Sequence, residues 1–395
     1  MLRLQGTAQR YAWGTVDAIP KLLQQPADGS PYAEYWMGAH PTAPAEVEGR
    51  PLNEFLAERP EVLGAASRDA FGDQLPYLMK VLSARHALSL QAHPSREQAV
   101  EGLAREDAEG LARDAAERTY RDDWPKPEIL IAVDEFHTLS GFREPRRTEA
   151  LFAGLGVADE LASVIGPLTE RRGTAALQEV FLDVLSLSGE RAHLSELVCA
   201  AAVNHQDSPG ELGAFARTVI ELDAVFPGDP GVLAALLMNR VVIPPGQGIY
   251  VPAGHMHAHL RGTGIEIMAN SDNVIRGGLT PKHVDVGELI KVVSFEPIDP
   301  ELTTPEVVCD GLLHYPTPCP EFDVWRIDAT AETRPVELPG AGSARVLFLV
   351  SGSGTLINGA DTLALTQGGA AFIPADEQVS FRGEAVGFLS ASGAR

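Results

Sequence analysis

Residues 250–260 of the 395-residue chain read YVPAGHMHAHL and place histidines at three alternate positions, His255, His257 and His259. Alternate residues of a β-strand point to the same face of a sheet. A strand here would therefore direct all three imidazoles toward one pocket. The chain holds only 11 histidines, so this local cluster calls for a chemical explanation.

Composition places the chain among ordinary soluble globular proteins with two or three cores, because 45% of its residues are hydrophobic and 22% are charged. A net charge of −23 disfavours a nucleic-acid partner, which requires clustered cations. We expect no membrane span and no secretory signal, since the sequence lacks a sufficiently long apolar run. Three cysteines without a CxxC pair favour a cytoplasmic location.

We predict that the chain is mainly β with an α-helical insert. Strand pairs are predicted over 75–93 and 127–143, and a solvent-facing helix between them begins after Ser95, a suitable N-cap. Amphipathic helical segments fill residues 146–228. Short apolar runs punctuated by Gly and Pro then return, as in antiparallel sandwiches and jelly rolls. We predict a catalytic β domain over 1–145 plus 229–320, a helical subdomain over 146–228, and a C-terminal β module over 321–395.

A faint internal repeat relates two of the β segments. The stretch IPPGQGIYVPAGHMHAHL aligns with LTQGGAAFIPADEQVSF near the C-terminus. In the second copy Glu377 stands where the first has His255, and Val379 stands where it has His257. We therefore predict that the C-terminal module repeats the same fold without its metal site.

The spacing Pro-x-Gly-x-x-His over 252–257 resembles the second motif of the cupin fold, a metal-binding jelly roll, and selects His257 among the three histidines. The companion motif has two ligands two residues apart, and its best match is LQAHP, with Gln91 and His93 on one strand face. A Gln carbonyl oxygen is an uncommon but competent neutral donor.

A fourth ligand should be an anionic oxygen, and the residues alone leave two candidates, Glu97 and Glu128. Two His, one Glu and one Gln would suit Zn²⁺ in an open catalytic site. Mn²⁺ and Fe²⁺ also accept mixed nitrogen and oxygen donors. The competing interpretation is that His93 and His257 are hydrogen-bonded core histidines, but the co-occurrence of two motifs in a β-rich context disfavours it.

Five ordered segments resemble the type I phosphomannose isomerases of the cupin superfamily. They are QRYAWG at the N-terminus, EYWMGAHPTAPAEV at 34–47, LPYLMKVLSARHALSLQAHP at 75–94, KPEILIAV at 126–133 and GIEIMANSDNVIRGGLTPKHVDV at 264–286. The helical insert and the C-terminal module are also expected in that family.

The resemblance implies a set of zinc ligands and one active-site arginine. The ligands fall on Gln91, His93, Glu128 and His257, which decides the carboxylate in favour of Glu128, and the arginine falls on Arg276. The family often has Tyr where this chain has His259, a predicted pocket residue.

The activity implied is interconversion of mannose 6-phosphate and fructose 6-phosphate through an enediol or enediolate. Arg276 would stabilise the developing charge on oxygen. Glu266 and Asp272 are the leading candidates for the base, with Lys282 as a further proton carrier.

The substrate phosphate requires cationic and hydroxyl donors, for which Ser89, Lys80 and Lys126 are the candidates, with Lys282 as another. The predicted partner is thus a small sugar phosphate, bound by a monomer or weak homodimer. The alternative function is a metal-binding cupin that binds sugar phosphates without turnover.

Overall fold

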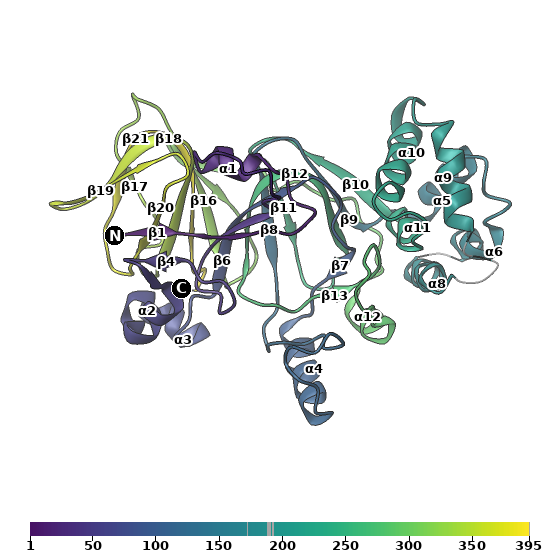
Figure 1. Ribbon diagram of the computed structural model, residues 1–395, viewed down its shortest axis with the longest axis horizontal. Coiled ribbons are helices and arrows are strands. Elements are labelled where there is room, and N and C mark those ends of the chain that lie inside the picture. Colours follow the sequence, from purple (N-terminus) through teal and green to yellow (C-terminus); the bar gives the residue numbers. More distant parts are fainter. Residues whose placement is uncertain (172, 188–190, 192, 395) are drawn as a thin grey trace.

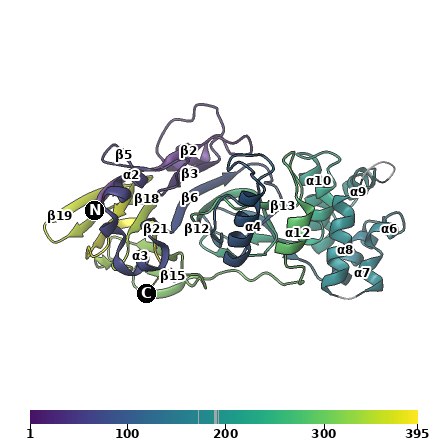
Figure 2. The ribbon, with the colours of Figure 1, turned by 90° about the horizontal axis from the view of Figure 1, so that it is seen from below.

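The computed structural model of the chain describes residues 1–171, 173–187, 191 and 193–394. Within them, Figures 1 and 2 show three regions in a row along the longest axis. A ten-stranded sheet lies in the middle, between a block of helices and an 11-stranded sheet. This arrangement confirms the predicted mainly β architecture with a helical insert.

The middle sheet curls into a barrel because its longest strand pairs with four others. β12 is hydrogen bonded to β9 and β7 through its first half and to β6 and β8 through its second half, always antiparallel. The strands of this sheet are β2 (Thr7–Gln9), β3 (Glu34–Met37), β6 (Tyr77–Ala84), β7 (Gln91–Ala92), β8 (Glu128–Ala132), β9 (Phe136–Phe142), β10 (Met238–Ile243), β11 (Gly248–Val251), β12 (His257–Ala269) and β13 (Ile275–Arg276).

The second sheet collects both ends of the chain. Its strands are β1 (Leu2–Gln5), β4 (Glu46–Val47), β5 (Arg50–Pro51), β14 (Glu306–Cys309), β15 (Leu312–Tyr315), β16 (Asp323–Ala329), β17 (Val336–Glu337), β18 (Arg345–Asn358), β19 (Asp361–Thr366), β20 (Ala370–Ile373) and β21 (Ser380–Ala391). Sheet membership thus differs from the predicted division, because β1, β4 and β5 precede residue 145 and the hairpin β14–β15 precedes residue 321. The pairing of β1 with β20 and of β15 with β16 accounts for the difference. The domain limits themselves stay a prediction.

The helices within residues 96–108 and 145–223 lie where the apolar periodicity predicts them, whereas the short helices of residues 18–71 and 286–292 were not predicted, and residues 231–235 are helical where strand was expected. Ser95 caps α4 with a capping box that includes Gln98. The helices are α1 (Ala18–Leu22), α2 (Leu52–Glu58), the 3₁₀ turn η1 (Pro60–Leu63), α3 (Ala65–Phe71), α4 (Arg96–Ala108), α5 (Pro145–Gly154), α6 (Ala162–Ile165), α7 (Pro167–Glu170), α8 (Thr174–Leu185), α9 (Leu194–Val203), α10 (Gly210–Asp223), α11 (Gly231–Ala235) and α12 (Val286–Val292). The predicted helical segments also include residues 172, 190 and 192, which lie outside the described residues. Among the described helices, none is long and apolar enough to cross a membrane.

The first half of β12 separates the helical block from the barrel interior. Met256, Ala258 and Leu260 belong to the core that α5 and α8 to α11 build against the barrel. The alternating residues His257 and His259 are buried on the opposite side. Period two therefore places these two histidines inside the barrel.

The second half of β12 faces a different core. Ile265 and Ile267 pack with Phe348 and Phe388 of the 11-stranded sheet, so the even-numbered Glu266 now points into the barrel. The residues that face the interior thus change from odd-numbered to even-numbered within β12. The reason is that the pairing with β9 shifts register between His259 and Arg261. Gly262 follows at φ +121°, where an added Cβ would lie 2.8 Å from the Cα of Phe136, so a side chain cannot be accommodated there.

The internal repeat has a structural counterpart. β11 and β20 occupy the aligned positions, and in both copies the residue two after the proline has positive φ: Gly254 at +75° and Asp376 at +66°. Val379, which aligns with His257, is buried in an apolar core of the C-terminal sheet. The two copies thus share the turn, and the second copy has a buried apolar valine in place of the histidine. That the whole module is a degenerate cupin stays a prediction.

Candidate metal centre

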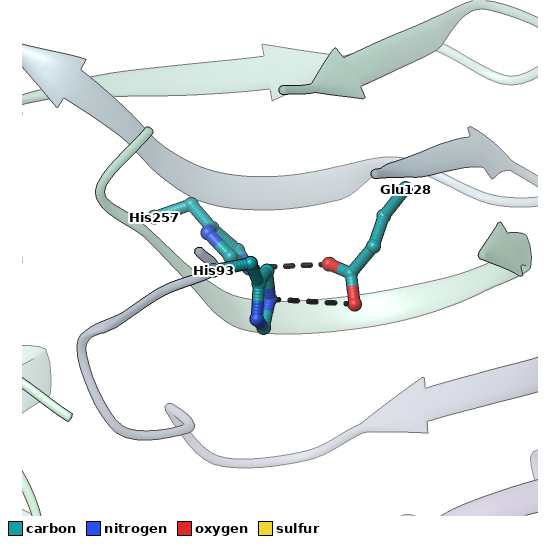
Figure 3. Close-up of side chains that lie close together, drawn as sticks. All are labelled: His93, Glu128 and His257. Atoms are coloured by element: carbon teal, nitrogen blue, oxygen red, sulfur yellow. Dashed lines mark ion pairs between the residues drawn. The ribbon is translucent and has the colours of Figure 1, made fainter. Parts of the chain in front are cut away.

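His93, Glu128 and His257 meet inside the barrel, although they are far apart in the sequence (Figure 3). His93 follows β7, Glu128 begins β8 and His257 begins β12. Glu128 Oε1 lies 3.4 Å from His93 Nε2, and Glu128 Oε2 lies 3.3 Å from His257 Nε2. One nitrogen or oxygen of each residue lies within 4.8 Å of the others. Three of the four predicted metal ligands are therefore brought together.

The hydrogen bonds of the two imidazoles leave their inner nitrogens available to a metal. Nδ1 of His93 is 2.8 Å from the carbonyl oxygen of Asn273, and Nδ1 of His257 is 3.2 Å from that of His255. A backbone carbonyl accepts a hydrogen bond from the Nδ1–H group, which fixes the proton on Nδ1 and leaves a lone pair on Nε2. Nε2 of His93 is buried without any hydrogen-bond partner among the described residues. An orphaned nitrogen facing a carboxylate fits a divalent metal better than it fits a packed core.

Gln91 lies on the same face as this cluster. In the antiparallel registers of β7 it stands opposite His257 on one side and opposite Arg276 on the other. Directly opposed side chains project to the same face of a sheet. The register therefore places Gln91 and Arg276 beside His257, as the predicted ligand set requires for Gln91.

Burial and charge keep His93 and Glu128 in the protonation states that bind a metal. Burial, aided by the Lys126 ammonium, lowers the pKa of His93 to about 4. Burial alone would raise the pKa of Glu128, but Lys126 and His93 hold it well below its usual range. Lys126 is itself buried and its Nζ lies 2.9 Å from Glu128 Oε1. At neutral pH the site offers the neutral imidazole of His93 and the ionised carboxylate of Glu128.

A second buried cluster adjoins the first. Lys80 Nζ contacts Glu34 Oε1 at 2.9 Å and Glu266 Oε2 at 2.5 Å, and Glu266 Oε1 lies 3.0 Å from His259 Nε2. Burial would lower the pKa of Lys80, but the carboxylates of Glu266 and Glu34 raise it above its ordinary value. Burial would likewise raise the pKa of Glu266, but Lys80 lowers it to about 2.

The buried side chains of the two clusters carry more negative than positive charge. The three carboxylates Glu34, Glu128 and Glu266 face the two ammonium groups Lys80 and Lys126, which leaves one negative charge among these buried side chains, and the half-buried Arg276 lies on the same face. An uncompensated buried charge is costly. A divalent metal would be attracted by the three carboxylates and would offset their negative charge. The donor set and the charge of the site therefore both fit such an ion.

The remaining predicted site residues lie at different depths. Arg276 is half-buried on β13, and Lys282 is exposed in the loop before α12. Asp272 lies 3.3 Å from the buried His40, whose hydrogen bond lowers the pKa of the Asp272 carboxyl. Ser89 is half-buried between β6 and β7. The roles predicted for these residues stay predictions.

His255 and Glu97 are excluded from the cluster by their own hydrogen bonds. His255 Nε2 lies 2.8 Å from Ser140 Oγ, and burial lowers the pKa of His255 to about 4. Glu97 is exposed in the first turn of α4 and accepts a hydrogen bond from Ser95. Glu128 is therefore the carboxylate of the pair that the residues alone had left open.

Two residues that contact the site were missed from the sequence: Glu34 and Asn273. Glu34 alternates with Trp36 in a strand-like run, and a carboxylate at that spacing could have indicated a buried partner for Lys80. Asn273 lies in a loop, where no periodicity identifies a neighbour.

A barrel with a buried His, Glu and His cluster and two compensating lysines defines a metal-binding protein of the jelly-roll class. Comparisons with known proteins narrow the class. A model of the catalytic domain of type I phosphomannose isomerases matches residues 1–145. The mannose-6-phosphate isomerase of Salmonella typhimurium strain LT2 is 35% identical over 386 residues, covering 95% of each chain. That of Rattus norvegicus is 32% identical over 410 residues, covering 95% of this chain and 94% of the rat protein.

A solved structure agrees. Mannose 6-phosphate isomerase from Salmonella typhimurium, bound to its substrate fructose 6-phosphate and to zinc, superimposes with a TM-score of 0.90 at 32% identity over 99% of both chains. The chain belongs to the type I phosphomannose isomerase family.

Proposed function

We propose that this protein is a zinc-dependent mannose-6-phosphate isomerase, which interconverts mannose 6-phosphate and fructose 6-phosphate. The observation that carries the proposal is the buried cluster of His93, Glu128 and His257 with an unpartnered His93 Nε2, in a chain of the same family over nearly its whole length. The substrate and metal named for the relative of known structure support both parts of the proposal.

The protein would hold zinc through His93, Glu128, His257 and Gln91. When bound, the metal supplies Lewis acidity, which polarises and orients sugar oxygens. Lys126 then serves to keep Glu128 ionised, since its ammonium group lies 2.9 Å from that carboxylate.

Glu266 is the preferred base for moving the proton between C1 and C2. It lies inside the barrel and is ionised at neutral pH, whereas Asp272 has a side chain that is 39% exposed and is engaged with His40. A pKa of about 2 makes a weak base. The proposal therefore requires Lys80 to turn from Glu266 toward a sugar oxygen when substrate binds, which would raise the pKa of Glu266.

Arg276 would stabilise negative charge on the enediolate oxygens. Its position opposite Gln91 directs its side chain to the metal-binding face, and burial together with Arg121 lowers the pKa of Arg276. A guanidinium that stays protonated can donate hydrogen bonds throughout the reaction.

The test is formation of fructose 6-phosphate from mannose 6-phosphate by the purified protein, before and after chelation and after zinc is added back. We expect turnover that chelation abolishes and zinc restores. Binding of mannose 6-phosphate by a fully zinc-loaded protein without turnover would instead establish the non-catalytic alternative. Turnover that survives complete metal removal would contradict the role of zinc.

The cytoplasmic location and the monomeric or weakly dimeric state remain predictions from composition. Sedimentation of the zinc-loaded protein across a range of concentrations would test the oligomeric state.

A further inference from the structure

The lysines that the sequence suggested for phosphate binding already have anionic partners. Lys80 lies within 2.9 Å of both Glu34 and Glu266, and Lys126 lies at the same distance from Glu128. A phosphate dianion placed among them would meet three carboxylates in a buried, low-dielectric interior, at a large cost in free energy. The phosphate therefore belongs elsewhere along the pocket.

Three further cations form no ion pair. Arg121, Arg276 and Lys282, here called the cationic rim, have no carboxylate within ion-pair distance among the residues that the structure describes, although Arg121 attracts the Asp272 carboxylate from further away. These cations repel one another. Burial and Arg121 lower the pKa of Arg276, and burial, Arg276 and Arg121 lower the pKa of Lys282. In a chain of net charge −23, three neighbouring cations without an ion pair repel one another, and an anionic ligand would relieve that repulsion.

The position of Arg121 is set by an extended clasp between two loops. The side-chain oxygen of Asn273 accepts from the backbone N–H of Arg121 at 2.8 Å, and its amide donates to the carbonyl of Trp124 at 2.9 Å. Asp122 in turn accepts from Ser271 Oγ at 2.8 Å. The loop that carries Arg121 is thus tied to the segment that leads into Arg276.

The same clasp is joined to the metal centre. Asn273, fully buried, also offers its backbone carbonyl to Nδ1 of His93. One residue therefore fixes both the orientation of a metal ligand and the loop that carries Arg121. Such a link holds two parts of a binding site at constant separation, which favours a ligand that spans both.

We propose that Arg121 is a phosphate-binding residue: the sugar phosphate lies with its C1 and C2 end at the metal cluster and its phosphate at the cationic rim, held by Arg121 and Lys282. This inference rests on the proposed function and extends it to the orientation of the substrate. Arg276 lies between the two ends, since β13 places it next to Gln91.

The experiment compares Arg121→Ala, Arg121→Lys and wild type, all zinc-loaded. Inorganic phosphate is titrated by calorimetry, and KM and kcat are measured with mannose 6-phosphate. For Arg121→Ala we expect phosphate binding weakened and KM raised, each about 10- to 100-fold, with kcat and zinc content little changed. Arg121→Lys should fall between, because it keeps the charge and loses the two-pronged hydrogen bonding.

The matched control is Arg146→Ala, which removes one exposed arginine of α5 that has no ion pair among the described residues and changes the net charge equally. It should leave both quantities as in wild type. Equal phosphate affinity in Arg121→Ala and wild type, or no phosphate binding by wild type, overturns the inference. If the wild type binds phosphate but shows no isomerase turnover, the proposed function is overturned. The comparison of phosphate affinities still decides whether Arg121 binds phosphate.

Discussion

At residue scale, the role of Glu266 can be separated from that of the other carboxylate that touches Lys80. Replacement of Glu266 by Gln keeps the shape and removes the ionised base, so we expect kcat to fall about 100-fold or more. Zinc content should be preserved, because Glu266 is not a proposed ligand. The control is Glu34→Gln, which also loses a Lys80 contact of 2.9 Å. Equal losses of kcat in the two variants would show that both carboxylates act only by keeping Lys80 protonated.

The three alternate histidines make a second test at this scale. His257→Ala should lower zinc affinity more than 100-fold, since it removes a ligand rather than a partner of one. His255→Ala should retain zinc, because the oxygen that accepts from His257 Nδ1 is a backbone carbonyl and remains. Metal content after dialysis against a graded chelator series measures both. Zinc loss in the His255 variant alone would mean that the wrong histidine was chosen.

At the scale of elements, Glu221 on α10 ties the helical block to the barrel. Its carboxylate contacts Arg240 of β10 at 2.7 Å and Arg261 of β12 at 2.6 Å. Burial would raise its pKa, but Arg240 and Arg261 lower it below the ordinary 4.5. A depressed carboxyl pKa contributes stability that is fully present above pH 4.5 and is lost as the pH falls through the folded-state value.

Glu221→Gln should therefore lower the free energy of unfolding at pH 7 by about 1 to 3 kcal/mol. The gap between wild type and variant should shrink as the pH falls below 4.5. Urea unfolding at several pH values measures this gap, with Glu196→Gln as control, since Glu196 is exposed and has no ion pair among the described residues. A gap that is constant with pH would assign the effect to packing instead of charge.

The parity of β12 shows where element-level prediction succeeds and fails. Alternation correctly separates His257 and His259 from Met256 and Ala258. It cannot place Glu266 on the same interior face, because the register shift and the positive φ of Gly262 change the parity within one strand. A bulge depends on the pairing partner, here β9, which lies more than 100 residues away in the sequence. Family resemblance, not periodicity, brought Glu266 into the predicted site.

At the scale of the whole molecule, predicted chain segments and observed structural units differ. Motifs identify the metal ligands because each motif is local, but sheet membership depends on long-range pairing. Thus β1, at the N-terminus, pairs with β20 near the C-terminus (Figure 1). A core of side chains from both sheets, including Ile265 and Phe348, fills the space between them. This shared core couples the metal-binding barrel to the C-terminal module.

That coupling predicts the response of the entire chain to zinc. A ligand that binds only the folded barrel stabilises everything that unfolds with it. Chelation should therefore raise amide exchange rates in β18 and β21 as well as in β12, measured by hydrogen–deuterium exchange. Ile265→Ala opens a cavity between the sheets at a cost of about 2 to 5 kcal/mol. This variant should weaken the effect of chelation on amide exchange in β18 and β21. Leu356→Ala, in the apolar core of the C-terminal sheet that excludes the barrel strands, should cost a similar amount and preserve it. If chelation affects β12 alone in the wild type, the two sheets unfold independently and the shared core does not couple them.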